Sequence, residues 1–158
     1  MKRAVIVAED ARFVAHEGFD WKGIEAAFEK NRQQGRIVAG GSTISQQLAK
    51  NLFLSHSRTP WRKLEEAIIT VMLETILEKR RILEIYLNII EWGNGIFGAE
   101  AAARYYFGCN AARLTAWQAA RLAAMVPNPR FYDTHRDASG LTRKAQIILR
   151  RLPSAKVP

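Results

Sequence analysis

Apolar side chains recur at steps of three and four between residues 60 and 91. They are Trp61, Leu64, Ile68, Val71, Met72, Ile76, Leu83, Tyr86, Leu87 and Ile90. These steps place the side chains on one stripe of a helix, and we expect that stripe to be buried. Thr59 can cap the helix, and Pro60 suits its first turn. Because one unbroken helix of this length would be unusual, we expect a break near residues 79–81.

Other segments carry helical signals as well. Thr115 and Gln118 form a capping box that opens a helix running to about Met125. Residues 141–151 read as a basic amphipathic helix, and residues 21–31 and 42–53 also look helical. The run AVIVA at residues 4–8 is short and apolar, so it suits either a helix or a strand. Residues 31–41 should be the least ordered. The sequence therefore predicts a mostly α-helical protein, with residues 1–158 forming a single domain.

The composition restricts the chemistry. Lys and Arg total 24 and Asp and Glu total 15, a formal charge of +9. Such a surface attracts phosphates in nucleic acid, anionic lipid or a pyrophosphate substrate, and charge alone does not choose among them. Cys109 is the single cysteine, which excludes an internal disulfide and a thiolate zinc cluster. The sequence contains no run of about 18 apolar residues, so it predicts no membrane-spanning helix.

Glu9 is the sharpest catalytic candidate. It follows the apolar run VIVA in the segment VAEDARFVAHEG. Apolar neighbours would raise the pKa of this carboxyl and make it a better base. The alternative is that Glu9 is only a helix end that meets water. Likewise, His16 taken alone suits a structural hydrogen bond as well as a ligand contact.

Residues 40–53, GGSTISQQLAKNLF, suggest an anion site. Ser42 or Thr43 can cap the helix that follows, and a helix N-terminus attracts negative charge. Lys50 lies two turns further on, with Gln47 and Asn51 as neutral donors. The alternative is an ordinary capped amphipathic helix with a solvated lysine.

Residues 57–66, SRTPWRKLEE, combine cations and carboxylates. Arg62 and Glu66 lie four residues apart, which suits a surface ion pair. The functional alternative makes Arg58 a phosphate ligand and Glu66 a second active-site carboxylate.

Residues 93–98 match the pattern GxGxxG, which is found in dinucleotide-binding proteins. That site needs a preceding strand and a later acid, whereas a helical pattern comes before these glycines. A glycine-rich turn between helices is therefore the better interpretation.

Taken together and in order, these motifs resemble a known family. They are EDARFVAHEG at residues 9–18, GSTISQQLAKN at 41–51, RKLEE at 62–66, KRRILEIYLN at 79–88 and GIFGAEAAARYYFG at 95–108. The series resembles the five-motif signature of the peptidoglycan glycosyltransferases, a lysozyme-like family that polymerises lipid II. The tail AWQAARLAAMVPNPRFYD also resembles the family, and because it lies close to the C-terminus we expect the monofunctional, biosynthetic type without a transpeptidase domain.

The resemblance implies a fold and a location. We expect a lysozyme-like domain with a larger globular lobe and a smaller mobile lobe over roughly residues 31–75. The family implies an amino-terminal membrane anchor that this sequence lacks, and work at the periplasmic face of the bacterial inner membrane. The implied partners are lipid II, the growing glycan on undecaprenyl pyrophosphate, the membrane surface, and cell-wall synthesis or division proteins, but not nucleic acid.

The resemblance also implies roles for residues. Glu9 would take the proton from the 4-hydroxyl of N-acetylglucosamine on lipid II, so that a β-1,4 bond forms with inversion. Lys50, Arg58 and the helix start at Ser42 and Thr43 would stabilise the departing pyrophosphate. Glu66 would either orient these cations or hold a divalent ion, Mg or Mn, at the diphosphate. The remaining implied substrate contacts are Asp10, His16, Gln47, Asn51 and Arg62.

Two other functions stay open from the sequence. The first is a muramidase-like hydrolase on the same scaffold, and the second is a basic helical module that binds nucleic acid or anionic membrane.

We also expect Phe53, Leu54 and Trp61 to lie against the bilayer surface. The alternative is that Phe53 and Trp61 belong to the core.

Overall fold

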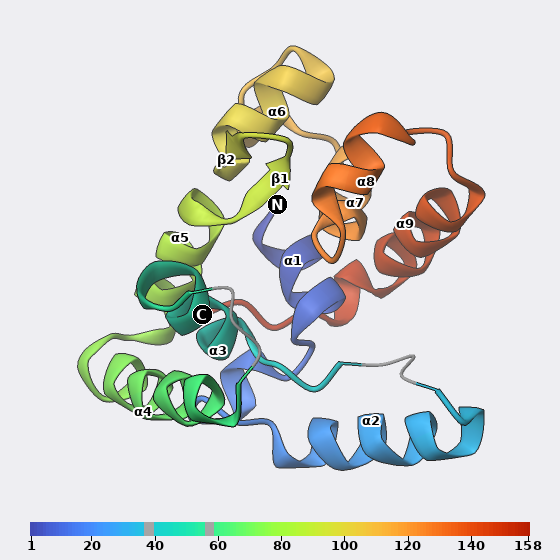
Figure 1. Cartoon of the computed structure of the whole chain (residues 1–158). Helices are drawn as coiled ribbons and strands as arrows, with labels where there is room; N and C mark the ends of the chain where they lie inside the picture. The colour runs from blue at the N-terminus through green and yellow to red at the C-terminus, as the bar shows by residue number, and fades with distance from the viewer. Residues whose placement is uncertain (37–39, 56–58) are drawn as a thin grey trace.

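The computed structural model describes residues 1–36, 40–55 and 59–158. Most of these residues are helical (Figure 1), which confirms the predicted fold class. The α-helices are α1 (Lys2–Glu9), α2 (Trp21–Gln34), α3 (Ile44–Phe53), α4 (Pro60–Ile76), α5 (Lys79–Ile89), α6 (Ala99–Phe107), α7 (Ala116–Met125), α8 (Pro129–Thr134) and α9 (Ser139–Arg151). Two short strands, β1 (Glu91–Gly93) and β2 (Ile96–Phe97), form a hairpin. Single 3₁₀ turns are η1 (Phe13–Ala15), η2 (Ala111–Arg113) and η3 (Leu152–Ser154).

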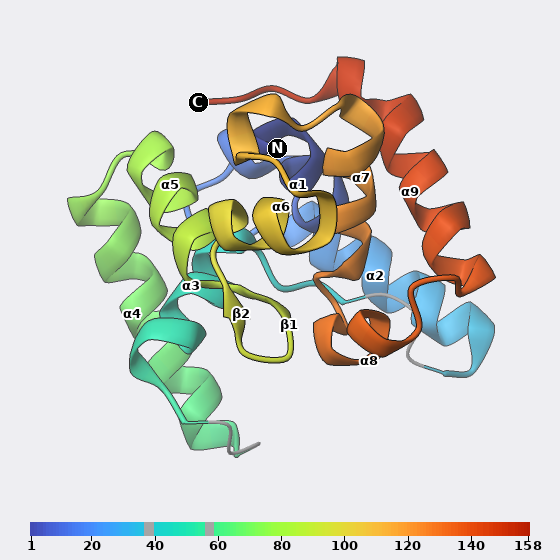
Figure 2. The same cartoon turned by 90° about the horizontal axis from the view of Figure 1, so that it is seen from above.

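Helix α1 lies near the centre of the molecule, with α7 and α9 packed against it (Figures 1 and 2). The run AVIVA is thus helical, and its residues Ala4, Val5 and Ile6 are buried. The buried face of α7 consists mainly of alanines, whose small side chains allow close helix packing. The end of α1 is therefore held firmly by the core.

Helix α3 packs against both α4 and α5. Its N-terminus has a capping box, in which Thr43 accepts a hydrogen bond from the Gln46 backbone and the Gln46 side chain bonds the Thr43 backbone. The predicted capping box of Thr115 and Gln118 is likewise present, and its helix ends at Met125 as expected. Both motifs fix helix starts through contacts three residues apart.

The apolar stripe of residues 60–91 divides into two helices with opposite environments. The break falls at residues 77–78, just before the predicted range. In α5 the stripe is buried, as predicted, at Leu83, Tyr86 and Leu87. In α4 the prediction was wrong, because the apolar side chains face outward: Trp61 is 68% exposed and Ile76 is 73% exposed.

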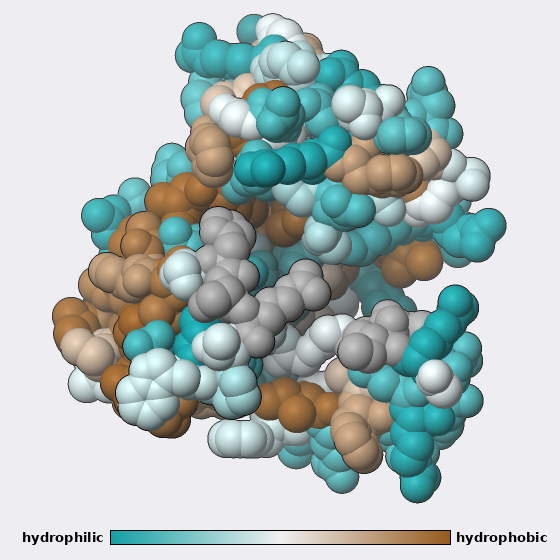
Figure 3. All heavy atoms as spheres, in the orientation of Figure 1, coloured by the Kyte–Doolittle hydropathy of each residue, from teal (hydrophilic) through white to brown (hydrophobic). Residues whose placement is uncertain are grey.

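Helix α4 instead buries polar residues against its neighbours. Its two buried residues are Glu66 and Thr70. The outward apolar residues are Trp61, Leu64, Ile68, Val71, Met72 and Ile76, and we call them the α4 face. Brown apolar spheres gather on the side of the molecule where α4 lies (Figure 3). Apolar residues gathered on an exposed helix face are typical of surfaces that bind a membrane or a partner protein.

The GxGxxG segment forms the β1–β2 hairpin between α5 and α6, so the turn interpretation is confirmed. Gly98 has a φ of +86°, and a Cβ there would lie 2.9 Å from the carbonyl oxygen of Asn88. Glycine is therefore required where the hairpin meets α6.

Helix α2 has no buried residue and lies along one edge of the molecule (Figure 1). Asp20 caps it through the Gly23 backbone, and Gly35 ends it in the left-handed conformation. Of the predicted least ordered stretch, residues 31–34 are helical instead, and residues 37–39 lie outside the described residues. Within the described ranges, no helix combines the length and the apolar character needed to cross a bilayer.

Candidate active site

Glu9 is the last residue of α1, and its carboxylate turns from the core toward α3. Its Oε2 accepts a hydrogen bond of 3.0 Å from Nε2 of Gln47. Its Oε1 is buried and has no hydrogen-bond partner among the described protein atoms. One acceptor oxygen of this carboxylate thus has no protein donor on its lone pairs, a property that a proton-accepting base needs.

Burial raises the pKa of the Glu9 carboxyl above its ordinary value, and the hydrogen bond from Gln47 opposes that rise. The positive charges of Lys144 and Lys50 also oppose it, whereas the negative charge of Asp10 adds to it. Burial in turn lowers the pKa of Lys144, and the charge of Glu9 opposes that shift. Glu9 is therefore a stronger base than a solvated glutamate, held among cations that favour its ionised form.

Asp10 and His16 form a buried pair. Nε2 of His16 lies 3.0 Å and 3.1 Å from the two carboxylate oxygens of Asp10. The Asp10 carboxylate also accepts a hydrogen bond from the Ile44 backbone at 3.1 Å. The His16 side chain is only 6% exposed. These side chains position α3 against α1, and the prediction that Asp10 and His16 contact the substrate stays a prediction.

The start of α3 likewise has its polar groups occupied from within the protein. The Thr43 hydroxyl donates to the Gly18 carbonyl at 2.6 Å and accepts from the Gln46 backbone. Asp10 already supplies the anion at the first helical N–H. Thr43 is thus a positioning residue in this structure, and the expectation that this helix start receives the pyrophosphate stays a prediction. Ser42 is exposed and remains accessible.

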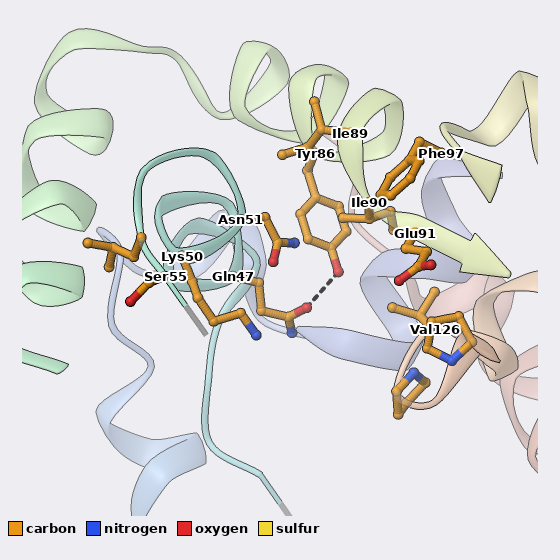
Figure 4. Close-up of a pocket in the computed structure, with 13 residues that line it drawn as sticks. Gln47, Lys50, Asn51, Ser55, Tyr86, Ile89, Ile90, Glu91, Phe97 and Val126 are labelled. Carbon is orange, nitrogen blue, oxygen red and sulfur yellow. Dashed lines mark hydrogen bonds between the residues drawn. The ribbon is translucent and has the colours of Figure 1, made fainter. Parts of the chain in front are cut away.

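A cavity of about 320 Å³ opens beside Gln47. Its lining comes from α3, α5, the hairpin and the segment joining α7 to α8: Gln47, Lys50, Asn51, Leu54, Ser55, Tyr86, Ile89, Ile90, Glu91, Phe97, Val126, Pro127 and Pro129. Figure 4 shows Gln47 and Lys50 on one side of this space and Glu91 across it. The structure thus brings together three predicted site residues, Gln47, Lys50 and Asn51.

A second, smaller cavity of about 110 Å³ borders Glu9 itself. Glu9 and Asp10 line it together with residues 40–43, including Ser42. Glu9 therefore borders one cavity directly and reaches the other through Gln47. This position suits a base that acts between two bound substrates.

Glu66 is 3% exposed and carries two cations on its carboxylate. Oε2 accepts a hydrogen bond of 2.7 Å from Nη1 of Arg62, and Oε1 contacts the ammonium of Lys63. The predicted pairing of Arg62 with Glu66 is present, but it is buried on the Glu66 side rather than a solvated surface pair. Because α4 packs against α3, this cluster belongs to the same half of the molecule as Lys50.

The donor set at Glu66 does not fit a divalent metal. Both carboxylate oxygens already face cations, and a metal ion would have to compete with their charge. In the described part of the chain, no group of three or more His, Cys, Asp or Glu side chains has the arrangement of a metal site. Arg58, the predicted phosphate ligand, lies outside the described residues.

Sequence reasoning missed three residues at this site. Tyr86 counted only as a buried stripe residue, yet its hydroxyl donates to Oε1 of Gln47 at 2.7 Å. Glu91 lines the cavity and is held by Nε of Arg130 at 3.0 Å. Lys144 acts on Glu9 from α9. No local pattern could have found Lys144, because 135 positions separate it from Glu9.

Comparison with known proteins decides the family. The family model described as "Transglycosylase" matches residues 1–153. The chain belongs to the transglycosylase family. Among curated transglycosylases, the biosynthetic peptidoglycan transglycosylases of Chromobacterium violaceum and Methylobacillus flagellatus are 73% and 72% identical. The protein of the same name from Laribacter hongkongensis is 68% identical. Each match covers 100% of this chain and 69% of the relative.

The family resemblance of the sequence motifs is therefore confirmed, and the family match covers residues 1–153 of this chain. Its motif residues Gln47 and Lys50 line the larger of the two cavities described above, and Glu9 lines the smaller one and is bonded to Gln47. The nucleic-acid-binding alternative is not favoured. It rested on net charge alone, whereas the family match rests on the sequence of residues 1–153.

Proposed function

We propose that this transglycosylase polymerises lipid II into β-1,4-linked glycan strands with release of undecaprenyl pyrophosphate. The observation that carries the proposal is the position of Glu9: one oxygen of its carboxylate has no partner among the described protein atoms, Glu9 lines the smaller cavity, and its hydrogen bond to Gln47 joins it to the cavity that Lys50 lines. Family membership and the names of the relatives support it. Peptidoglycan synthesis takes place in the cell envelope, and we place this domain at the periplasmic face of the inner membrane.

Glu9 acts as the general base. A sugar hydroxyl is a poor nucleophile, so its proton must leave as the new bond forms. Oε1 of Glu9 accepts the proton from the 4-hydroxyl of the acceptor N-acetylglucosamine, and that oxygen attacks C1 of the donor sugar. The bond from C1 to the pyrophosphate breaks on the opposite face. The configuration at C1 is therefore inverted, and the α-linked donor becomes a β-linked product.

Cations stabilise the leaving group. Negative charge builds up on the pyrophosphate as the bond breaks, and fixed positive charge facing it lowers the barrier. Lys50 is exposed at the cavity and supplies such charge. Arg62 and Lys63 are held in place by Glu66, so we assign Glu66 the role of orienting cations. If a divalent ion takes part, we propose that the diphosphate itself provides its main ligands.

The hydrolase alternative is less well supported. Hydrolysis of a glycosidic bond needs an acid that protonates the sugar leaving group and a second carboxylate nearby. Asp10 is engaged by His16, and Glu66 is engaged by two cations. A pyrophosphate leaving group needs positive charge rather than a proton, and the site residues supply that charge.

The α4 face provides the contact with the membrane. Phe53, which the sequence analysis predicted at the bilayer, is 60% exposed, and Trp61, the first residue of the α4 face, is also exposed. Phe53 and the α4 face together form an apolar surface, and the basic residues of the chain can meet anionic headgroups. Lipid-linked substrate would then reach the site without leaving the bilayer.

Incubation with labelled lipid II tests the proposal. Long glycan and free undecaprenyl pyrophosphate should both accumulate, and muramidase digestion should return β-1,4-linked disaccharide units. The same preparation should not shorten preformed glycan. Shortened glycan without polymerisation would support the hydrolase instead.

A further inference from the structure

Two hydrogen bonds link Tyr86, Gln47 and Glu9 in one chain. The Tyr86 hydroxyl donates to Oε1 of Gln47 at 2.7 Å (Figure 4), and Nε2 of Gln47 donates to Oε2 of Glu9 at 3.0 Å. The three residues come from α5, α3 and α1, which are far apart in sequence. The inference below rests on the proposed role of Glu9 as the base.

The chain has a fixed direction. Tyr86 is fully buried, and in the described structure the acceptor of its hydroxyl hydrogen is the Gln47 carbonyl. Burial raises the pKa of the Tyr86 phenol well above its ordinary value, and the charges of Glu9 and Asp10 add to the effect. Tyr86 therefore keeps its proton. The Gln47 carbonyl is held at Tyr86, and its amino group is held at Glu9.

The reversed amide would be costly while Glu9 is ionised. It would turn the Gln47 carbonyl toward a carboxylate, so that two acceptors would face each other. It would also leave the buried Tyr86 hydroxyl without an acceptor. Only a protonated Glu9 could donate to the reversed carbonyl. The orientation of this amide and the protonation of Glu9 are therefore coupled.

We propose that Tyr86 is a positioning residue for the reaction: its hydroxyl locks the Gln47 amide in the orientation that favours the ionised, proton-accepting form of Glu9. Tyr86 acts through Gln47 and does not itself contact the reacting atoms. It keeps the base ready between turnovers, because the hydrogen bond from the locked amide to Oε2 is stronger when Glu9 is ionised than when Oε1 carries a proton.

Other charged groups face Glu9 and must be separated from this effect. Asp10 follows it on the same chain segment, Lys50 faces it from α3, and Lys144 faces it from α9. The buried residues of α7, which also packs against α1, are apolar. The test must therefore change the Tyr86 hydroxyl without changing any of these charges.

Tyr86→Phe does so, because it removes one oxygen and keeps the ring. The acidic limb of kcat for lipid II polymerisation should move to higher pH, by about one unit if most of the Gln47 hydrogen bond is lost. The rate well above that limb should recover, and KM should change little. A loss of equal size at every pH would indicate a merely structural role and would overturn the proposal.

Tyr106→Phe is the matched control. It removes another hydrogen-bonded phenol, which donates to the Trp92 carbonyl and Asp133. Its acidic limb should coincide with that of the unmodified chain. A double variant adds Gln47→Met. If Tyr86 acts through Gln47, then Tyr86→Phe should cause no further shift in the Gln47→Met background, and a full additional shift would contradict the proposal.

A measurement without turnover separates this inference from the proposed function. The Glu9 carboxyl is titrated by ¹³C NMR and assigned with Glu9→Gln. Its pKa should rise in Tyr86→Phe even if lipid II is not the substrate, and an unchanged pKa would overturn the inference. If Tyr86→Phe does not fold, 3-fluorotyrosine at position 86 keeps the shape and is a stronger donor. It should lower the Glu9 pKa, and a rise or no change would overturn the inference.

Discussion

The Asp10 carboxylate accepts a hydrogen bond of 3.1 Å from the backbone N–H of Ile44, and this contact joins the end of α1 to the start of α3. Helix α1 ends in Glu9, and α3 carries Gln47. The contact therefore sets the distance between the proposed base and the helix that supplies its partner. The Asp10 side chain thus contributes both to the geometry of the site and to the stability of the fold.

Replacing Asp10 should destabilise the chain for that reason. Asp10→Ala leaves the buried His16 ring and the first N–H of α3 without their acceptor, which should lower the free energy of unfolding by about 1–3 kcal/mol. Urea denaturation measures the change. Asp137→Ala, at an exposed position, should stay within about 0.5 kcal/mol of the unmodified chain. Equal effects at the two positions would contradict the role assigned to Asp10.

Glu9 should make stability depend on pH in a specific direction. Because burial raises its pKa in the folded state, the folded chain binds this proton more tightly than the unfolded chain does. Its contribution to stability is fully present below the unfolded pKa and is lost as pH rises through the folded pKa. Glu9→Gln should thus be more stable than the unmodified chain at neutral pH, with the difference shrinking toward about pH 4. Thermal denaturation at a series of pH values measures it, and a constant difference would count against a raised pKa.

The buried ion pair at Glu66 should be costly to break. Glu66→Gln leaves Arg62, whose side chain is largely buried, without its charged partner, and about 3–5 kcal/mol of stability should be lost. Glu84→Gln is the control, because its pair with Arg81 is exposed on both sides and should contribute about 1 kcal/mol or less. Similar unfolding midpoints for the two variants would show that Glu66 does not hold its cations as described.

The α4 face should matter only where a bilayer is present. Ile68→Glu places a charge on that face at a residue that is 54% exposed, so the fold should tolerate it. Binding to phosphatidylglycerol vesicles should fall severalfold, and polymerisation of vesicle-borne lipid II should fall with it, while turnover in detergent stays near normal. Ile147→Glu, at an exposed apolar residue on α9, should leave vesicle binding intact. Unchanged vesicle binding by Ile68→Glu would contradict the membrane contact.

Local signals accounted for most of the helices. The capping box at Thr115 acts across three residues, so sequence alone located that helix start, whereas for the helix at Thr43 it left Ser42 and Thr43 as alternative caps. The α4 face shows the limit of such signals. Periodicity establishes that apolar residues share one face of a helix, but it does not establish what covers that face. Because Glu66 is buried inside the protein, α4 turns its apolar face outward, opposite to the predicted orientation of this helix.

The site could be predicted as a set of residues but not as a geometry. Motif order pointed to Glu9 and Gln47, yet the bond between them spans 38 positions, and the bond from Tyr86 to Gln47 spans 39. Long-range contacts of this kind depend on how helices pack, which no short pattern encodes. Asp10 shows the same limit, since its role at the start of α3 follows only from that packing.

The rate of lipid II polymerisation by Glu9→Gln, measured in a single turnover beside the unmodified chain, tests the central claim most directly. Glutamine keeps the size of the side chain and a donor and acceptor, but it cannot accept the proton. The rate should fall by about 10²–10⁴-fold while the circular dichroism spectrum and substrate binding are retained. A folded Glu9→Gln chain that polymerises lipid II within about twofold of the normal rate would contradict the assignment of Glu9 as the base.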